Sequence, residues 1–134
     1  MANNAAGASD AVGVGIDLVD VARIENMLAR YGRTFLEKTF TEAEISHCSK
    51  LAAPHIHYAA RFAAKEAVVK ALGTGFSDDI SMKSISVEND SRGAPLALLD
   101  AAALARMKEL GANKVLISLT HLKDYAQAIA VLSK

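Results

Sequence analysis

Hydrophobic residues alternate with other residues near the start of the chain. They stand at positions of one parity: Val12, Val14, Ile16 and Leu18. This period of two predicts a strand over 12–18. Apolar residues then recur at helical spacing, at Val21, Ile24, Met27 and Leu28. They predict a helix over about 20–31, with Asp20 as its N-cap and Gly32 at its end.

Similar patterns mark elements along the rest of the chain. Thr41 and Glu44 have the form of a capping box and predict a helix over about 42–50. Pro54 suits the first turn of a long helix to Leu72, which Gly73 would end. Further predictions are a short irregular piece with Phe35, Leu36 and Phe40, strands at 84–89 and 95–99 around a turn at 90–93, a helix from the cap Asp100 to Leu110, and strands at 114–120 and 125–132.

These elements, with no repeat and no internal linker, predict one α+β domain over 12–134. Its mostly antiparallel sheet would pack against the long central helix. Residues 1–11 are small and polar and predict a flexible extension. The strand at 126–132 is small and apolar on both parities, so its second face is buried under the long helix of the same chain or against another subunit. The pattern alone leaves both interpretations open.

Composition narrows the class of protein. The 134 residues are 51% hydrophobic, which is typical of a globular domain. Fifteen basic and fifteen acidic residues cancel, so no overall field favours nucleic acid or a membrane surface. Arg23, Arg30 and Arg33 remain a candidate local basic patch. No apolar run is long enough to span a bilayer, and the N-terminus lacks the features of a secretory signal.

The single cysteine, Cys48, excludes an internal disulfide and fits the reducing cytoplasm, which we predict as the location. His47, His55 and His57 stand near it in the sequence. Their spacing matches no zinc-binding pattern, so we interpret this segment as a surface loop. The residues give no role for these three histidines.

The stretch from Arg61 to Gly75 carries the strongest candidate chemistry. Glu66 and Lys70 are four residues apart and share one face of the predicted long helix. They form either a solvated ion pair or a site in which Glu66 holds a hard cation and lysines hold phosphate. Asp17, on the opposite parity of the first strand, places an acid near the corner between strand and helix. Gly13 and Gly15 lack the further glycine of a dinucleotide motif, and the chain has no phosphate loop.

Five segments together resemble a known family: 13–24, 40–44, 61–75, 92–95 and 118–126. In this order they are similar to bacterial holo-acyl-carrier-protein synthases, the small trimeric type of 4′-phosphopantetheinyl transferase. The resemblance implies the fold of that superfamily and transfer of 4′-phosphopantetheine from coenzyme A to a serine of apo acyl carrier protein, for fatty acid biosynthesis. Adenosine 3′,5′-bisphosphate would be the other product. It also implies a homotrimer with active sites between adjacent subunits.

The resemblance implies roles for particular residues. Asp17 and Glu66 match the ligands of Mg²⁺, and Lys70 would reach the pyrophosphate. Lys65 would meet a second phosphate or a neighbouring subunit, or form a structural salt bridge. The turn and a strand end would contact the nucleotide, through Gly73, Thr74, Gly75, Thr120 and His121.

The base and the partner surface follow from the same resemblance. The base is Glu66 or a water held by the metal, and His121 is a candidate helper in proton transfer. The partner, an acidic carrier protein, would meet Arg23, Arg30 and Arg33.

Two other functions compete with the transferase. One is a non-catalytic module that binds coenzyme A or a nucleotide, and the other is a structural oligomerisation domain. Both are disfavoured by the presence of two acids, Asp17 and Glu66, because phosphate binding alone gains nothing from carboxylates without a metal. The sequence does not identify the preferred carrier protein or decide between Mg²⁺ and Mn²⁺.

Overall fold

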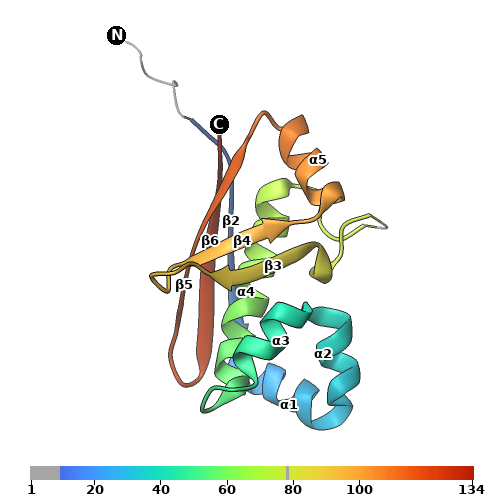
Figure 1. Cartoon of the computed structure of the whole chain (residues 1–134), viewed down its shortest axis with the longest axis vertical. Coiled ribbons are helices and arrows are strands. Elements are labelled where there is room, and N and C mark those ends of the chain that lie inside the picture. Colours follow the sequence, from blue (N-terminus) through green and yellow to red (C-terminus); the bar gives the residue numbers. More distant parts are fainter. Residues whose placement is uncertain (1–9, 78) are drawn as a thin grey trace.

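The computed structural model describes residues 10–77 and 79–134. A long helix, α4 (Pro54–Leu72), runs through the centre of the molecule, with strands along one side and short helices around its ends (Figure 1). Pro54 lies in its first turn and Gly73, at φ 75°, ends it, as predicted. Its many alanines are buried almost all round, and such a helix belongs in a core rather than at a surface.

Three long antiparallel strands cover one face of α4. They are β2 (Ala11–Asp20), β6 (Tyr125–Ser133) and β5 (Lys114–His121), in the order β2-β6-β5. A separate hairpin of β3 (Ile85–Asn89) and β4 (Pro95–Leu99) crosses in front of them (Figure 1). The prediction of an α+β domain with antiparallel strands packed on a long helix is confirmed, with the strands divided between two sheets.

Four short helices complete the fold: α1 (Val21–Tyr31), α2 (Arg33–Thr39), α3 (Glu42–Cys48) and α5 (Ala101–Glu109), together with a 3₁₀ turn, η1 (Met82–Ser84). Asp20 and Asp100 cap α1 and α5, and the capping box of Thr41 and Glu44 is complete. The prediction of an irregular piece around Phe35 is wrong. Phe35 and Leu36 lie in α2, and Phe40 directly follows its last residue. The helix has no side-chain cap at its start and is too short to show a periodic pattern.

Two glycines allow β2 to lie directly on α4. A Cβ placed on Gly15 would be 1.9 Å from the carbonyl oxygen of Ala67, and one on Gly13 would be 2.6 Å from that of Ala71. Any side chain at these positions would therefore separate strand from helix. The Gly-x-Gly of the sequence serves packing, and it fixes how close Asp17 comes to the helix.

The two parities of β6 have different surroundings. Ala126, Ala128, Ala130 and Leu132 are buried against α4, so the interpretation of burial under the chain's own helix holds for this parity. The opposite face of the sheet is exposed and apolar, with Val14, Ile16, Leu18, Leu116 and Ile129 at 40–65% exposure. Large apolar surface of this kind marks an interaction site. Among the described helices, none is long and apolar enough to cross a bilayer.

The predicted extension over 1–11 falls mostly on residues outside the described ones. Asp10 and Ala11 are described, and β2 already begins at Ala11. The carbonyl of Asp10 accepts a hydrogen bond from the Lys134 amide, which joins the two ends of the described chain.

Candidate functional site: two carboxylates and a lysine between β2 and α4

The structure brings Asp17, Glu66 and Lys70 together where β2 crosses α4. The Lys70 Nζ lies 3.0 Å from Asp17 Oδ1 and donates to the Ile16 carbonyl at the same distance. The carboxylate of Asp17 is largely buried, at 14% exposure, while Lys70 is 54% exposed. Lys70 therefore pairs with the acid of the strand, and the ion pair with Glu66 that helical spacing suggested is not formed within the described structure.

Glu66 is the perturbed acid of this site. Burial raises the pKa of Glu66 above the usual range of a glutamic acid, and the negative charge of Asp17 raises it further. The positive charges of Lys70 and Arg23 act in the opposite direction on this pKa. Two carboxylates thus repel each other beside a cation, which is the arrangement that a divalent ion would relieve.

The donor set fits a hard cation that completes its shell from elsewhere. Mg²⁺ is usually held by one or two carboxylates together with water and phosphate oxygens. In the described part of the chain, no three His, Cys, Asp or Glu side chains converge on one point. Asp17 and Glu66 are therefore suited to a magnesium ion shared with a substrate phosphate and unsuited to a closed structural metal site.

Lys65 lies apart from this site, in the interior. Its Nζ is 2.6 Å from Glu44 Oε1 and donates to the Ile85 carbonyl at 2.6 Å, and both side chains are fully buried. Glu44 also accepts from the amides of Thr41 and Val87. This ion pair joins α3, α4 and β3. The structure thus favours the structural salt bridge over the predicted phosphate contact for Lys65.

Thr120 and His121 lie at the opposite edge of the sheet, at the end of β5. The His121 ring packs edge-on against His57 of α4, with 5.4 Å between ring centroids. Burial lowers the pKa of His57, and the nearby positive charges of His121, Arg61, His47 and His55 lower it further. The interpretation of this segment as a surface loop is wrong for its histidines: His47 lies in α3, and His55 and His57 lie in the first turns of α4. The two helices bring these histidines near His121 and Arg61 in one cluster.

Arg61 is a candidate binding residue that sequence analysis missed. It is buried, at 5% exposure, and its Nε has no hydrogen-bond partner among residues 10–77 and 79–134, while Nη2 donates to Asn89 Oδ1 over 2.8 Å. A cavity of about 200 Å³ beside it is lined by Ala43, His47, Arg61, Val87, Glu88 and Asn89. A buried guanidinium with a free N–H group can hold an anion. The signal was an arginine within an otherwise apolar stretch of α4.

The three arginines predicted for a partner lie along α1 and the start of α2. Arg23 lies over the Phe62 ring at 5.5 Å, Arg30 lies over Tyr31, and Arg33 pairs with Glu37 at 2.9 Å. All three are exposed. Arg23 is also close enough to influence the charge of Glu66.

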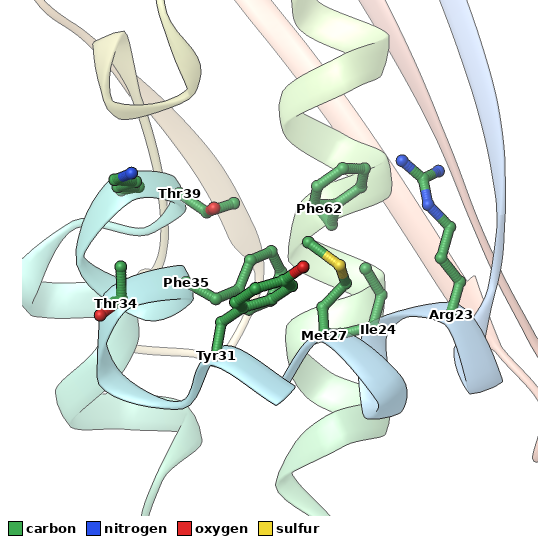
Figure 2. Close-up of a pocket in the computed structure, with 9 residues that line it drawn as sticks. Arg23, Ile24, Met27, Tyr31, Thr34, Phe35, Thr39 and Phe62 are labelled. Atoms are coloured by element: carbon green, nitrogen blue, oxygen red, sulfur yellow. The ribbon is translucent and has the colours of Figure 1, made fainter. Parts of the chain in front are cut away.

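An apolar cavity of about 460 Å³ opens beside Arg23. Figure 2 shows its floor, where the side chains of Met27, Tyr31, Phe35 and Phe62 gather between α1, α2 and α4. Arg23 and Lys38 also line this cavity. It is therefore a hollow with cationic groups at its border, close to the carboxylate site.

The turn predicted to border a nucleotide follows α4 directly. Gly73 and Gly75 both adopt positive φ, 75° and 63°, and Thr74 donates from its hydroxyl to the Gly75 carbonyl. The turn is exposed. Lys70, one helical turn earlier, lies near it on the same helix.

Comparisons with known proteins agree with the resemblance seen in the sequence. Residues 13–130 match the family model described as the 4′-phosphopantetheinyl transferase superfamily. The holo-[acyl-carrier-protein] synthase of Syntrophus aciditrophicus is 46% identical over 120 residues, which cover 90% of this chain and 94% of that protein.

Solved structures show the same fold. The holo-[acyl-carrier-protein] synthase of Neisseria meningitidis superimposes with a TM-score of 0.85 at 31% identity, covering 92% of this chain and 99% of that one. The synthase of Helicobacter pylori, solved in complex with coenzyme A, gives 0.79 at 32% identity, covering 90% and 99%. The chain therefore belongs to the 4′-phosphopantetheinyl transferase superfamily, within its family of holo-[acyl-carrier-protein] synthases.

Proposed function

We propose that this protein transfers 4′-phosphopantetheine from coenzyme A to a serine hydroxyl of an apo acyl carrier protein of fatty acid synthesis. The observation that carries the proposal is the cluster of Asp17, Glu66 and Lys70 at the crossing of β2 and α4. The family relationship and the coenzyme A complex of the Helicobacter pylori relative support it.

In this reaction the serine oxygen attacks a phosphorus of the coenzyme A pyrophosphate. A new bond forms between that phosphorus and the serine oxygen, and the bond to the bridging oxygen breaks. Adenosine 3′,5′-bisphosphate leaves with the electron pair of the broken bond. Chemistry of this kind depends on charge neutralisation and alignment more than on covalent help from the protein.

The three site residues divide this work. Asp17 and Glu66 would hold Mg²⁺, which when bound offsets negative charge on the pyrophosphate. Lys70, exposed and already 3.0 Å from Asp17, neutralises charge on the departing phosphate oxygen. Glu66 or a water held by the metal is our candidate to accept the serine proton.

The carrier protein would dock on the apolar cavity beside α1. The cavity offers Met27, Phe35 and Phe62 to an apolar side chain, while Arg23, Arg30 and Arg33 face an acidic partner. Arg23 is near both the cavity and Glu66, so a partner seated here presents its serine close to the proposed base. Complementary charge mainly raises the association rate and weakens with salt.

The basic cluster at the other edge of the sheet suggests an assembly. Arg61 precedes Lys70 by nine residues, which is about 13 Å along α4 and half a turn around it. A phosphate beside Arg61 and a phosphate beside Lys70 therefore lie on opposite sides of α4 in one chain. We propose a homotrimer in which coenzyme A bridges these two groups on adjacent copies, joined through the exposed apolar face of β2, β6 and β5. A cytoplasmic location stays a prediction.

The central test is the mass of an apo acyl carrier protein after incubation with coenzyme A, Mg²⁺ and this protein. We expect a mass gain that corresponds to one phosphopantetheine group. A chelator in the reaction mixture should prevent this gain, and added Mg²⁺ should restore it. Asp17→Asn and Glu66→Gln should abolish the gain while the circular dichroism spectrum is unchanged. Lys50→Gln, an exposed lysine away from the site, is the matched control.

The same assay distinguishes the competing binding module. Binding of coenzyme A without any mass gain, over several carrier proteins, would favour a non-catalytic module. Full activity of either carboxylate variant would contradict the metal assignment. Sedimentation of Ile16→Glu as a monomer, with loss of transfer, is the expected result if the apolar face joins the copies.

A further inference from the structure

The C-terminal end of α4 is held by a side chain from another helix. Arg106 of α5 donates from Nε to the Leu72 carbonyl over 2.9 Å. Its Nη1 lies 3.2 Å from the Glu109 carboxylate, one turn along α5. The last carbonyls of a helix have no partner within it, so Arg106 satisfies a group that would otherwise be unpaired. It also brings positive charge to the negative end of the helix dipole.

This contact lies directly behind the turn at Gly73–Gly75. A Cβ placed on Gly73 would be 3.7 Å from Arg106 Nη2. Within the described residues, Nη2 itself makes no hydrogen bond, while Nε and Nη1 are both engaged. One guanidinium therefore fixes the end of α4, is fixed in turn by Glu109, and leaves a charged N–H group beside the turn.

We propose that Arg106 is a positioning residue for coenzyme A. It holds the end of α4 from which the turn begins, so that the backbone N–H groups of Thr74 and Gly75 can be presented to an anionic phosphate, and it adds positive charge at the same place. The inference rests on the proposed function and on the expectation, from the family resemblance, that this turn borders the nucleotide. Since Arg106 lies in α5, far from the carrier cavity at α1, its effect is on coenzyme A and not on the carrier protein.

The test compares Arg106→Gln and Arg106→Lys with the control Lys108→Gln, which removes an exposed cation from the same helix. Arg106→Gln should raise KM and Kd for coenzyme A about tenfold, the size expected for a lost hydrogen bond to a charged group. Its kcat and its KM for the carrier protein should stay within about twofold of the wild type, because the groups at the reacting atoms are intact. Arg106→Lys keeps the positive charge but lacks the planar guanidinium with its several N–H donors. Its KM and Kd for coenzyme A should therefore lie between those of the wild type and those of Arg106→Gln.

Hydrogen exchange gives a readout that does not depend on activity. In Arg106→Gln the amides of 73–77 should exchange faster, while those of β2 and β6 keep wild-type rates. An unchanged KM for coenzyme A would overturn the proposal. An equal rise in the KM for the carrier protein would overturn it too, since that pattern reflects general structural damage.

Two further outcomes separate this inference from the proposed function. If the wild type binds coenzyme A without transferring its phosphopantetheine, the proposed reaction fails, and the Kd comparison still decides on Arg106. If the wild type does not bind coenzyme A, both fail. Should Arg106→Gln not fold, Glu109→Gln is the alternative variant. It removes the ion pair that fixes the Arg106 guanidinium but leaves the arginine in place, so a smaller rise in KM for coenzyme A is expected. No rise in that variant overturns the proposal.

Discussion

The close contact between β2 and α4 makes Gly15→Ala a sharp test of how the site is built. The added Cβ would lie 1.9 Å from the Ala67 carbonyl oxygen and 2.7 Å from the Ala71 amide nitrogen. Both neighbours are backbone atoms of the central helix, so neither can rotate away. The strand must move outward by roughly 1.5 Å to reach ordinary van der Waals separation.

The energetic cost follows from two opposing effects. Overpacking of this kind destabilises by about 1–3 kcal/mol, and here the clash is with rigid backbone. Replacing glycine by alanine within a strand returns roughly 0.5–1 kcal/mol of conformational entropy. We therefore expect a net loss of about 2 kcal/mol, or a Tm lower by roughly 5–10 °C at equal protein concentration.

The effect on activity should be larger than the effect on stability. Asp17 follows Gly15 by two residues and faces the same side, so the outward shift moves its carboxylate away from Glu66 and Lys70. A displacement of about 1 Å in a positioned group can cost on the order of a hundredfold in rate. Carrier modification should therefore fall strongly at temperatures where the variant is still folded.

Gly13→Ala provides a graded comparison in the same strand. Its added Cβ would lie 2.6 Å from the Ala71 carbonyl oxygen, a milder conflict and farther from Asp17. Thermal unfolding and initial transfer rates should rank wild type, Gly13→Ala and Gly15→Ala in that order. The reasoning would be refuted if Gly15→Ala were as stable and as active as the wild type. It would also be refuted if Gly13→Ala lost more stability or activity than Gly15→Ala.

Three other changes have predictable outcomes. Lys65→Met leaves the Glu44 carboxylate buried without its counter-charge and should lower the free energy of unfolding in urea by about 3–5 kcal/mol. The double variant Glu44→Gln/Lys65→Met should lose less stability than Lys65→Met alone, and an unchanged urea midpoint in Lys65→Met would contradict the structural role of the ion pair. Because the folded protein raises the pKa of Glu66, it binds more protons than the unfolded chain above the usual pKa of a glutamic acid, so this group lowers stability as pH rises. Without metal, Glu66→Gln should therefore melt higher than the wild type at pH 7 and equally at a pH below that usual value; a lower melting temperature at pH 7 would count against the shared-charge site. Ala53 precedes α4 at φ 51°, so Ala53→Gly should relieve left-handed strain and match or slightly exceed wild-type stability by thermal melting, whereas Ala53→Val should lose more than about 1 kcal/mol.

Local patterns in the sequence were sufficient for most of the fold. Caps at Asp20, Thr41 and Asp100 and a stop at Gly73 are short-range signals, and each occurs in the structure. The helix α2 escaped prediction because its seven residues show too little periodicity and its N-cap, Gly32, offers no side-chain cap of the kind that marks α3. The division of the strands into two sheets depends on pairing between distant segments, which no local pattern contains.

The candidate site was predictable in its acids and less so in its cations. Asp17 and Glu66 stood out as carboxylates at a strand end and on a helix face. Lys65 and Arg61 lie in the same stretch, yet the burial of Lys65 with Glu44 depends on α3 and β3, and the free Nε of Arg61 depends on its cavity. Such roles are set by tertiary neighbours, so the residue types alone could not assign them.

The placement of Glu66 and Arg61 on different sides of α4 has a genetic consequence. If adjacent copies each supply half of a site, a chain damaged at Glu66 and a chain damaged at Arg61 are complementary. In a mixed assembly of the two chains, some sites would take Glu66 from the chain damaged at Arg61 and Arg61 from the chain damaged at Glu66. Such sites would carry both residues intact. Two alleles that are each inactive alone would then restore part of the activity when expressed together.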